Sequence, residues 1–271
     1  MIDEKTNKYL IEVKADSLSN DPDNTLISRK YYEESYGKYL SASFDDFDGT
    51  IRNYRGETII SFNTMIGFLI VLLPINSYGL KNLNQKERLK LVLNANTVDK
   101  EIKDSVNEFY YIYHTKANFM PLPQDVWMPN NTPVIDLKNL NQIKGSFKKY
   151  YDFPDEFFSD VRKVVEKEEQ IADVSGFYTE INSSYFQIYK ANWENYVEWN
   201  YLQPFFVDDE YRIPVNLAPG NTFPRNWTEL NNLNHEQKQK CIDEIQDFWK
   251  NAIKIIKARG QLLLDKDTKS I

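Results

Sequence analysis

The fold is decided by the C-terminal run 234-NHEQKQKCIDEIQDFWKNAIKIIKARGQLLL-264. Apolar residues recur in it at intervals of three and four, which gathers side chains along one face of an α-helix. Asn234 stands before the periodic run as an N-cap, and Gln237 follows three residues later as its capping partner. The sequence predicts a helix over residues 234–264 that packs on the core through one apolar stripe, made of Ile242, Ile245, Trp249, Ala252 and Ile256.

Helical spacing recurs in several other segments. It predicts helices at residues 28–39, 85–93, 98–109 (capped by Thr97), 155–170 and 179–202. Strand patterns are limited to residues 110–114 and 57–61, and two proline-containing stretches, 120–133 and 203–224, predict ordered loops. We therefore expect a mainly α fold, a single compact helical domain with a minor β element, and an α+β arrangement is the alternative.

Composition bounds the class of protein. The chain has 271 residues, 41% of them hydrophobic and 14% aromatic, so one globular domain spanning residues 1–271 is expected. Its formal charge of -7 opposes binding to nucleic acid unless a local basic patch exists. The lone Cys241 allows no intramolecular disulfide, which is consistent with a reducing compartment.

The longest apolar run, residues 65–73, predicts a buried helix or strand. It is far shorter than the roughly 20 residues that a membrane span needs. The N-terminal residues carry acids and no long apolar stretch, unlike a secretory signal. We therefore expect a soluble, cytoplasmic protein with no membrane partner.

Residues 109–123, FYYIYHTKANFMPLP, form the most distinctive segment. An aromatic run ends there on His114, and Asn118 follows before a proline-locked exit. The imidazole has an ordinary pKa near 6.5 and can act as a general acid or base, so His114 and Asn118 are candidate catalytic residues. The structural alternative is a buried histidine, hydrogen-bonded to backbone, that fixes the loop.

Two further places carry candidate binding residues. Asp21 and Asp23 flank a proline before a helix, where they could orient a cation or a substrate hydroxyl, or serve as acids of a turn and helix cap. Arg259 lies in a cationic last part of the C-terminal helix, where it complements the helix dipole or binds phosphate. His114 and His235 are the only histidines, and no phosphate loop or nucleophile elbow occurs, so we predict no metal site and identify no cofactor.

Residues 21–31 (DPDNTLISRKY), 114–123 (HTKANFMPLP) and 193–203 (WENYVEWNYLQ) together resemble a bacterial family of unknown function. The resemblance covers most of the chain, through Asp-Pro-Asp and His-Thr-x-x-Asn-Phe-x-Pro-x-Pro motifs. Lys116 and Ala117 stand where that family has Ile-Gly. The sporadic occurrence of such genes hints at accessory roles such as defence against phage. The candidate binding residues are Asp21, Asp23, Arg29, Lys116 and Arg259.

A weaker likeness is to nucleases of the His-metal-finger type, through residues 118–123 and 141–150. The upstream His-Ile-x-Pro element of those enzymes does not occur here, so their mechanism would lack its water activator. Two functions stay open. The first is a binding or regulatory module with a protein partner, and the alternative is an enzyme of nucleotide or phosphodiester chemistry that uses His114.

Overall fold

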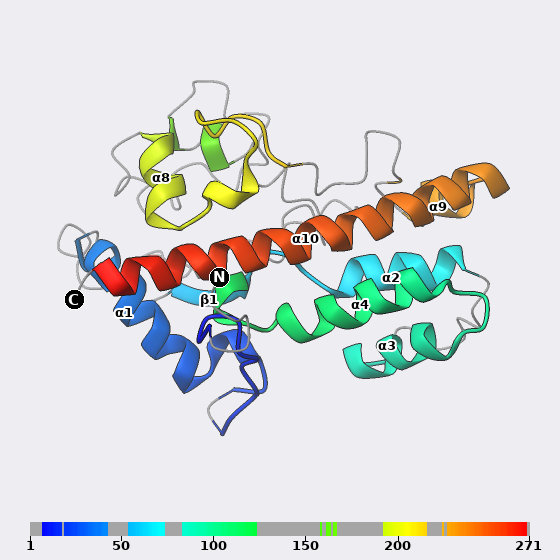
Figure 1. Ribbon diagram of the computed structural model, residues 1–271, viewed down its shortest axis with the longest axis horizontal. Helices are drawn as coiled ribbons and strands as arrows, with labels where there is room; N and C mark the ends of the chain where they lie inside the picture. Colours follow the sequence, from blue (N-terminus) through cyan, green and yellow to red (C-terminus); the bar gives the residue numbers. More distant parts are fainter. Residues whose placement is uncertain are drawn as a thin grey trace, which may run out of the picture.

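A computed structural model describes residues 7–17, 19–42, 54–73, 83–123, 158, 161–163, 165–166, 192–215, 224 and 227–269. Helices dominate them, which confirms the mainly α fold, and the long helix α10 (His235–Lys269) runs along the molecule (Figure 1). The other elements, in chain order, are η2 (Pro22–Asn24), α1 (Leu26–Ala42), β1 (Tyr54–Thr58), α2 (Asn63–Leu72), α3 (Gln85–Asn94), α4 (Lys100–Ile112), η4 (Lys116–Asn118), β2 (Phe119–Pro123), α8 (Trp193–Trp199), η7 (Gln203–Phe205) and α9 (Trp227–Asn231).

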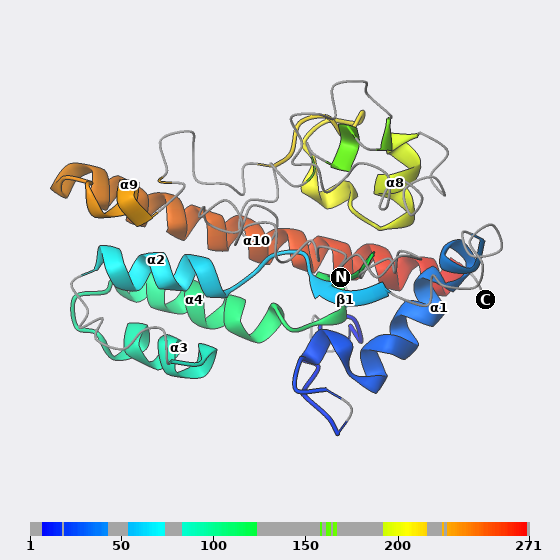
Figure 2. The ribbon, with the colours of Figure 1, turned by 180° about the vertical axis from the view of Figure 1, so that it is seen from behind.

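Helix α10 is the axis on which the rest is assembled. It packs directly against α4, η4, α2 and η7. Helices α2, α3 and α4 lie along its N-terminal half, and α1, β1 and α8 lie around its C-terminal half, as the two opposite views show (Figures 1 and 2). Segments distant in sequence therefore meet at the C-terminal half of α10.

The start of α10 has the predicted capping box. The backbone N–H of Gln237 donates to Asn234 Oδ1 at 2.9 Å, and that of Asn234 donates to Gln237 Oε1 at 2.9 Å. All five residues of the predicted stripe are buried. The helix continues to Lys269, beyond the predicted end at Leu264.

The apolar run at residues 65–73 is helix α2 with its C-cap Leu73. Because this helix is apolar on nearly all sides, it lies in the core rather than on its edge. Phe62, just before it, stacks on Phe109 and Tyr113 of the α4 region, with ring centroids 6.1 and 5.3 Å apart. Phe109 and Tyr113, at the two ends of the aromatic run 109–113, are therefore core residues, whereas Tyr111 is exposed.

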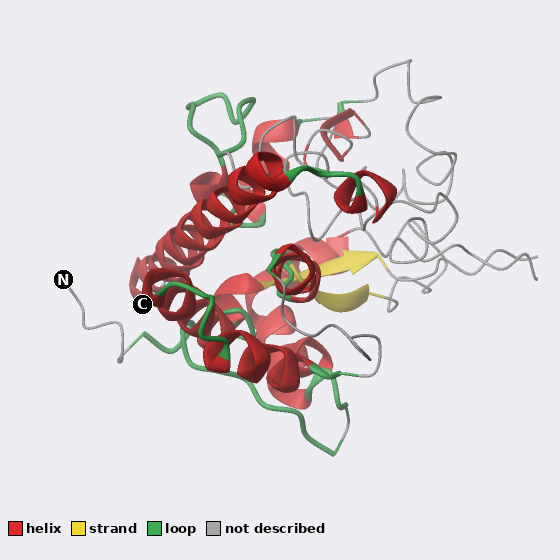
Figure 3. Ribbon diagram, turned by 90° about the vertical axis from the view of Figure 1, so that its right-hand side faces the viewer, coloured by secondary structure: helices red, strands yellow, loops and turns green. Residues whose placement is uncertain are grey.

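Strands β1 and β2 pair antiparallel, in a register from Tyr54↔Pro123 to Thr58↔Phe119, and Figure 3 shows the pair in yellow among the helices. A two-stranded sheet has only edge strands, so β2 accommodates its prolines. The strand expected at 57–61 overlaps β1 only at Glu57 and Thr58, and residues 59–61 lie outside the strand. The strand expected at 110–114 is wrong, because Phe109 and Tyr113, four residues apart, face the core from the last turn of α4 and its C-cap.

The turn η2 lies against β1 at Gly56. A Cβ there would stand 2.0 Å from the carbonyl oxygen of Asp23 and 2.3 Å from the hydroxyl of Tyr32. Asn24 closes the contact, since its Nδ2 donates to the Gly56 carbonyl at 3.0 Å and its Oδ1 accepts from the Gly56 N–H at 3.1 Å. Only glycine allows this approach.

The remaining helix predictions divide into two groups. Helices α1 and α3 occur where expected, but α4 begins at Lys100 with Asp99 as its N-cap, not Thr97. Phe158, Val161 and Val165 are buried, as the pattern of the 155–170 segment indicates. The rest of that segment lies largely outside the described residues, as do 124–133, 179–191 and most of 216–226.

Within the described ranges, no helix is both long enough and apolar enough to cross a membrane.

Candidate functional site

The predicted catalytic turn, residues 114–118, is joined to the N-terminal segment by backbone bonds. The carbonyl of His114 accepts from the N–H of Val13 at 2.8 Å, and Thr115 forms a β-bridge with Glu12. The N–H of Ala117 donates to the carbonyl of Tyr9 at 2.9 Å. The turn is thus part of the scaffold.

The side chain of Asn118 is fully buried and committed to backbone groups. Its Nδ2 donates to the carbonyls of Ile60 and Tyr113, both at 2.9 Å, and its Oδ1 accepts from the Ile60 N–H at 3.0 Å. These bonds join the end of α4 to the residues after β1. No donor of this amide remains for a substrate, so Asn118 has a structural role in this fold.

The imidazole of His114 is partly buried, and its ring centroid lies 3.7 Å from that of Tyr113. Burial lowers its pKa to about 4, although the carboxylate of Asp21 acts in the opposite direction. The imidazole is therefore neutral near pH 7. Among the described residues, none forms a hydrogen bond with it, so no partner there orients it as a general base requires.

Asp21 and Asp23 do come near this turn. Burial raises the pKa of Tyr113 most, and the charges of Asp21 and Asp23 raise it further. The charge of Asp21 also raises the pKa of His114. Asp23 is buried and accepts from Asn24 Nδ2 at 2.8 Å. The charge of Asp21 therefore acts on His114, whereas the carboxylate of Asp23 is used within the turn.

The three basic candidates have different surroundings. Arg29 is exposed on α1, and Lys116 is half-buried. Arg259 is fully buried. Its guanidinium donates to the carbonyls of Ala117 (2.6 Å), Phe119 (3.0 Å), Asn200 (3.0 Å) and Tyr201 (3.1 Å) and to the hydroxyl of Tyr36 (2.7 Å).

These contacts use all the N–H groups of Arg259, since a guanidinium has five. Arg259 thus ties α10 to the turn after α4, to the end of α8 and to α1. The phosphate-binding role predicted for this residue has no free donor here. Its charge is surrounded by carbonyl oxygens, which solvate it in place of water.

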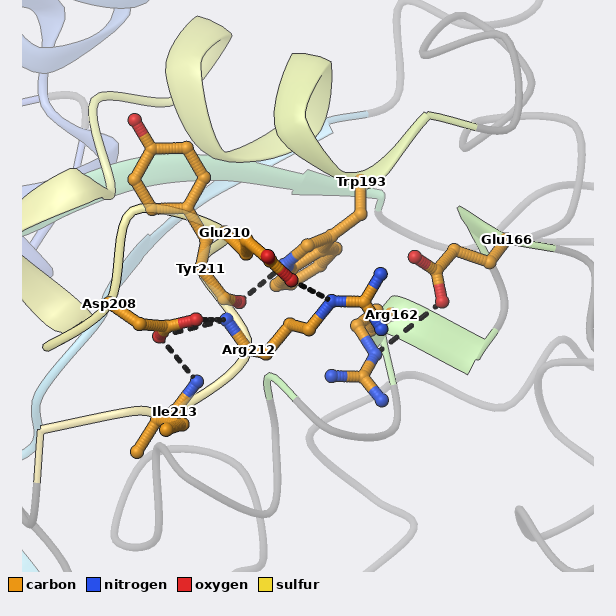
Figure 4. A network of polar contacts seen from close by, with 8 residues as sticks. All are labelled: Arg162, Glu166, Trp193, Asp208, Glu210, Tyr211, Arg212 and Ile213. Carbon is orange, nitrogen blue, oxygen red and sulfur yellow. Dashed lines mark hydrogen bonds and ion pairs between the residues drawn. The ribbon is translucent and has the colours of Figure 1, made fainter.

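A cavity of about 430 Å³ lies elsewhere, between α8, the loop after η7 and the segment that contains Glu166 (Figure 4). Four carboxylates and a single cationic group occur among its described lining residues. That cation, Arg212, is already ion-paired with Glu210 at 3.0 Å. The lining residues are Glu166, Asn192, Trp193, Glu194, Asp209, Glu210 and Arg212.

One carboxylate fixes the loop that forms this wall. Asp208 accepts from the backbone N–H of Arg212 at 2.9 Å and of Ile213 at 2.7 Å, as Figure 4 shows. Burial alone would raise the pKa of Asp208, but these bonds outweigh it and the pKa lies below its ordinary value. The indole N–H of Trp193 donates to the carbonyl of Tyr211 at 2.6 Å, so the loop is also held to α8.

The other acids of the wall differ in their partners. Glu166 pairs with Arg162 at 3.5 Å, but Glu194 and Asp209 have no cationic partner within the described part of the chain. Both are exposed, and both raise the pKa of Tyr211, although its burial raises it more. The described lining of the cavity therefore carries a net negative charge.

Sequence reasoning missed this cavity. The sequence signal of the cavity is the acidic run 208-DDE-210 followed by Arg212, inside the stretch 203–224 for which the sequence predicts only an ordered loop. Among the residues that the structure describes, no group of three or more His, Cys, Asp or Glu could hold a metal ion. Comparisons of the chain with protein-family models, curated proteins and solved structures gave no match.

Proposed function

We propose that this protein is a binding module that accepts a positively charged segment of a protein partner in the cavity beside Trp193. The observation that carries the proposal is the pair of exposed carboxylates, Glu194 and Asp209, in the lining of the cavity. The guanidinium in that lining, Arg212, is already paired with Glu210. The accessory or phage-defence role suggested by the sequence resemblance belongs to the same proposal.

The proposal rests physically on charge complementarity between a cationic segment and the carboxylates of a preorganised surface. Glu194 and Asp209 have no cationic partner among the described residues, so a cation that enters the cavity need not displace one. The loop that carries Asp209 is already ordered by Asp208 and Trp193, so little conformational entropy is lost on binding. Such contacts mainly set specificity and association rate.

Calorimetric titration with hexalysine tests the proposal. Removing both charges by Glu194→Gln with Asp209→Asn should weaken binding about tenfold, since each exposed ion pair contributes up to about 1 kcal/mol. The matched control is Glu236→Gln with Asp247→Asn, two exposed acids of α10 outside the cavity. Equal weakening in both double variants would show attraction to net charge alone and overturn the proposal.

The enzyme alternative is supported by one observation, the charge of Asp21 acting on the imidazole of His114. General acid–base catalysis uses carboxylates to tune the proton affinity of an imidazole. His114→Gln separates the two functions. Loss of the cellular phenotype in a variant that still folds and still binds hexalysine favours the enzyme, and a retained phenotype favours the module.

A further inference from the structure

The loop that carries acids of the cavity begins and ends on a short antiparallel pairing. Phe206 forms a β-bridge with Pro214, and the N–H of Val207 donates to the carbonyl of Ile213 at 2.9 Å. Val207 and Ile213 are therefore cross-strand neighbours, and the Cβ atoms of such neighbours lie about 5 Å apart on one face of the ribbon. We call these two residues the aliphatic pair.

The two faces of this pairing have opposite surroundings. Phe206 points into the protein, where its ring centroid lies 5.8 Å from that of Trp193 and 5.3 Å from that of Phe158. Because successive side chains of a strand alternate in direction, Val207 points the other way. Val207 and Ile213 are 65% and 58% exposed. The aliphatic pair is thus an apolar surface in contact with solvent.

The aliphatic pair adjoins the acid-lined cavity without forming part of its lining. Ile213 directly follows the lining residue Arg212 in the chain. Val207 stands two positions before the lining residue Asp209, so their Cα atoms are at most about 7 Å apart. The side chain of Ile213 points away from Glu166 (Figure 4). A ligand that extends out of the cavity along this loop would therefore meet the pair at the rim.

The distance between the pair and the acids is fixed by Asp208. Its carboxylate accepts from the N–H groups of Arg212 at 2.9 Å and Ile213 at 2.7 Å, which closes the loop onto the start of its return strand. An apolar surface and a set of carboxylates are thus held at one spacing before any partner arrives. Little conformational entropy is lost when both are used at once.

We propose that the partner segment bound by the cavity is amphipathic: a cationic residue meets the carboxylates, and an aliphatic residue two to four positions away packs on the aliphatic pair. This inference rests on the proposed function and specifies the chemistry of its partner. An extended peptide advances about 3.3 Å per residue, so this spacing spans about 7 to 13 Å, from the cavity to its rim. Burial of apolar surface adds affinity that exposed ion pairs alone do not supply.

Charge favours this partner over the other two surfaces that could cover an apolar pair. An anionic membrane would face the net negative charge of the cavity lining beside the pair. A second copy related by a two-fold axis would bring the same loop against itself, and its acids against one another. A cationic amphipathic peptide meets neither repulsion.

Two six-residue peptides of equal charge test the proposal by calorimetry, Lys-Lys-Leu-Leu-Lys-Lys and Lys-Lys-Ser-Ser-Lys-Lys. The leucine peptide should bind wild type about fivefold more tightly than the serine peptide, because its aliphatic side chains become partly buried. Val207→Ser with Ile213→Ser should remove this difference and change the affinity for the serine peptide less than about twofold, since its contacts are with the acids.

The matched control is Leu26→Ser with Ile27→Ser, which removes two exposed aliphatic side chains of α1. It should keep the preference for leucine. If the serine variant of the aliphatic pair does not fold, Val207→Thr with Ile213→Thr keeps β-branched side chains on the ribbon and should still lower the preference at least twofold.

The two proposals fail in different ways. Failure of both peptides to bind wild type would overturn the cationic-segment proposal and this one together. Equal binding of the two peptides would overturn only the aliphatic contact. A preference for leucine that persists in folded Val207→Ser with Ile213→Ser would place the apolar contact elsewhere and would also overturn it.

Two further measurements identify the other occupants. Sedimentation of the protein alone would reveal a wild-type dimer that Val207→Ser with Ile213→Ser converts to a monomer, if a second copy covers the pair. Flotation with phosphatidylserine vesicles would reveal binding that the same variant abolishes, if a membrane covers it. Either result would overturn the proposal, which predicts a monomer that stays off the vesicles.

Discussion

Two turns of the molecule are each ordered by one polar side chain. We call residues 114–118, which lie against the core, the inner turn, and the loop after η7, which lies at the surface, the outer loop. In the 114–118 turn, the amide of Asn118 binds backbone groups of Ile60 and Tyr113 inside the core. In the loop after η7, the carboxylate of Asp208 binds the N–H groups of Arg212 and Ile213 at the surface. In both turns one polar side chain orders the backbone.

The difference lies in the polar groups that remain free. The inner turn leaves Asn118 with no donor to offer, and Arg259 binds the carbonyls on its other side. The outer loop uses Asp208 for its own geometry, whereas Asp209, which lines the cavity, has no cationic partner among the described residues. A polar residue in a distinctive turn therefore indicates function only when its own atoms are not already bonded.

Arg259→Met should have the largest effect, because it leaves the inner turn without its clamp. Four buried carbonyls and the Tyr36 hydroxyl would lose their donor, so the free energy of unfolding should fall by about 3 to 5 kcal/mol. Urea unfolding measures this loss. Arg259→Lys should recover only part of it, because an ammonium has three donors and no planar fork. A loss under about 1 kcal/mol would show that the inner turn does not depend on this clamp.

Asn118→Ala should be the next most damaging change. It would leave the N–H and carbonyl of Ile60 and the carbonyl of Tyr113 without their partner, at a cost of about 2 to 4 kcal/mol in unfolding free energy. Asn232→Ala, at an exposed position between α9 and α10, is the matched control and should be nearly neutral. Equal stability of the two variants would show that the bonds of Asn118 do not stabilise the 114–118 turn.

His114 should make the stability of the inner turn depend on pH. Its folded pKa of about 4 lies below the ordinary value of 6.5, so the unfolded chain binds a proton more readily. The contribution of His114 to the free energy of unfolding is fully present above pH 6.5. It is lost as the pH falls toward 4, by up to about 3 kcal/mol. His114→Gln should remove that part of the slope, measured as the difference between the two pH profiles of urea unfolding. Parallel profiles would contradict the assignment.

The parts of the fold that the sequence predicts are those built from local signals. The stripe of α10 and its Asn234–Gln237 cap lie within one continuous segment, so spacing alone identifies them. The strand expected at residues 110–114 failed because aromatic residues favour strands, while their packing at Phe109 and Tyr113 follows the period of a helix. Tertiary packing decided between the two patterns.

The sites were less predictable because their partners are distant or unmarked. Arg259 binds backbone carbonyl oxygens, which every residue possesses, so no residue type along the chain indicates that Arg259 is buried. The acid-lined cavity joins Glu166, Glu194 and Asp209, and each of these alone is an ordinary surface acid. Only the fold brings them together.

The smallest predicted effect tests whether the outer loop binds through its geometry or only through its charge. Asp208→Ala and Asp208→Asn remove the same charge, but asparagine keeps one oxygen that can accept from the N–H groups of Arg212 and Ile213. If the ordered loop matters, Asp208→Ala should weaken hexalysine binding about threefold to tenfold, through lost preorganisation, and Asp208→Asn should bind more tightly than Asp208→Ala. Hydrogen exchange at those two amides should accelerate mainly in the alanine variant, because only there is the acceptor gone. Equal affinities in the two variants, with exchange accelerated only in alanine, would mean that the carboxylates act as a diffuse charge. The outer loop would then differ from the inner turn in exposure alone.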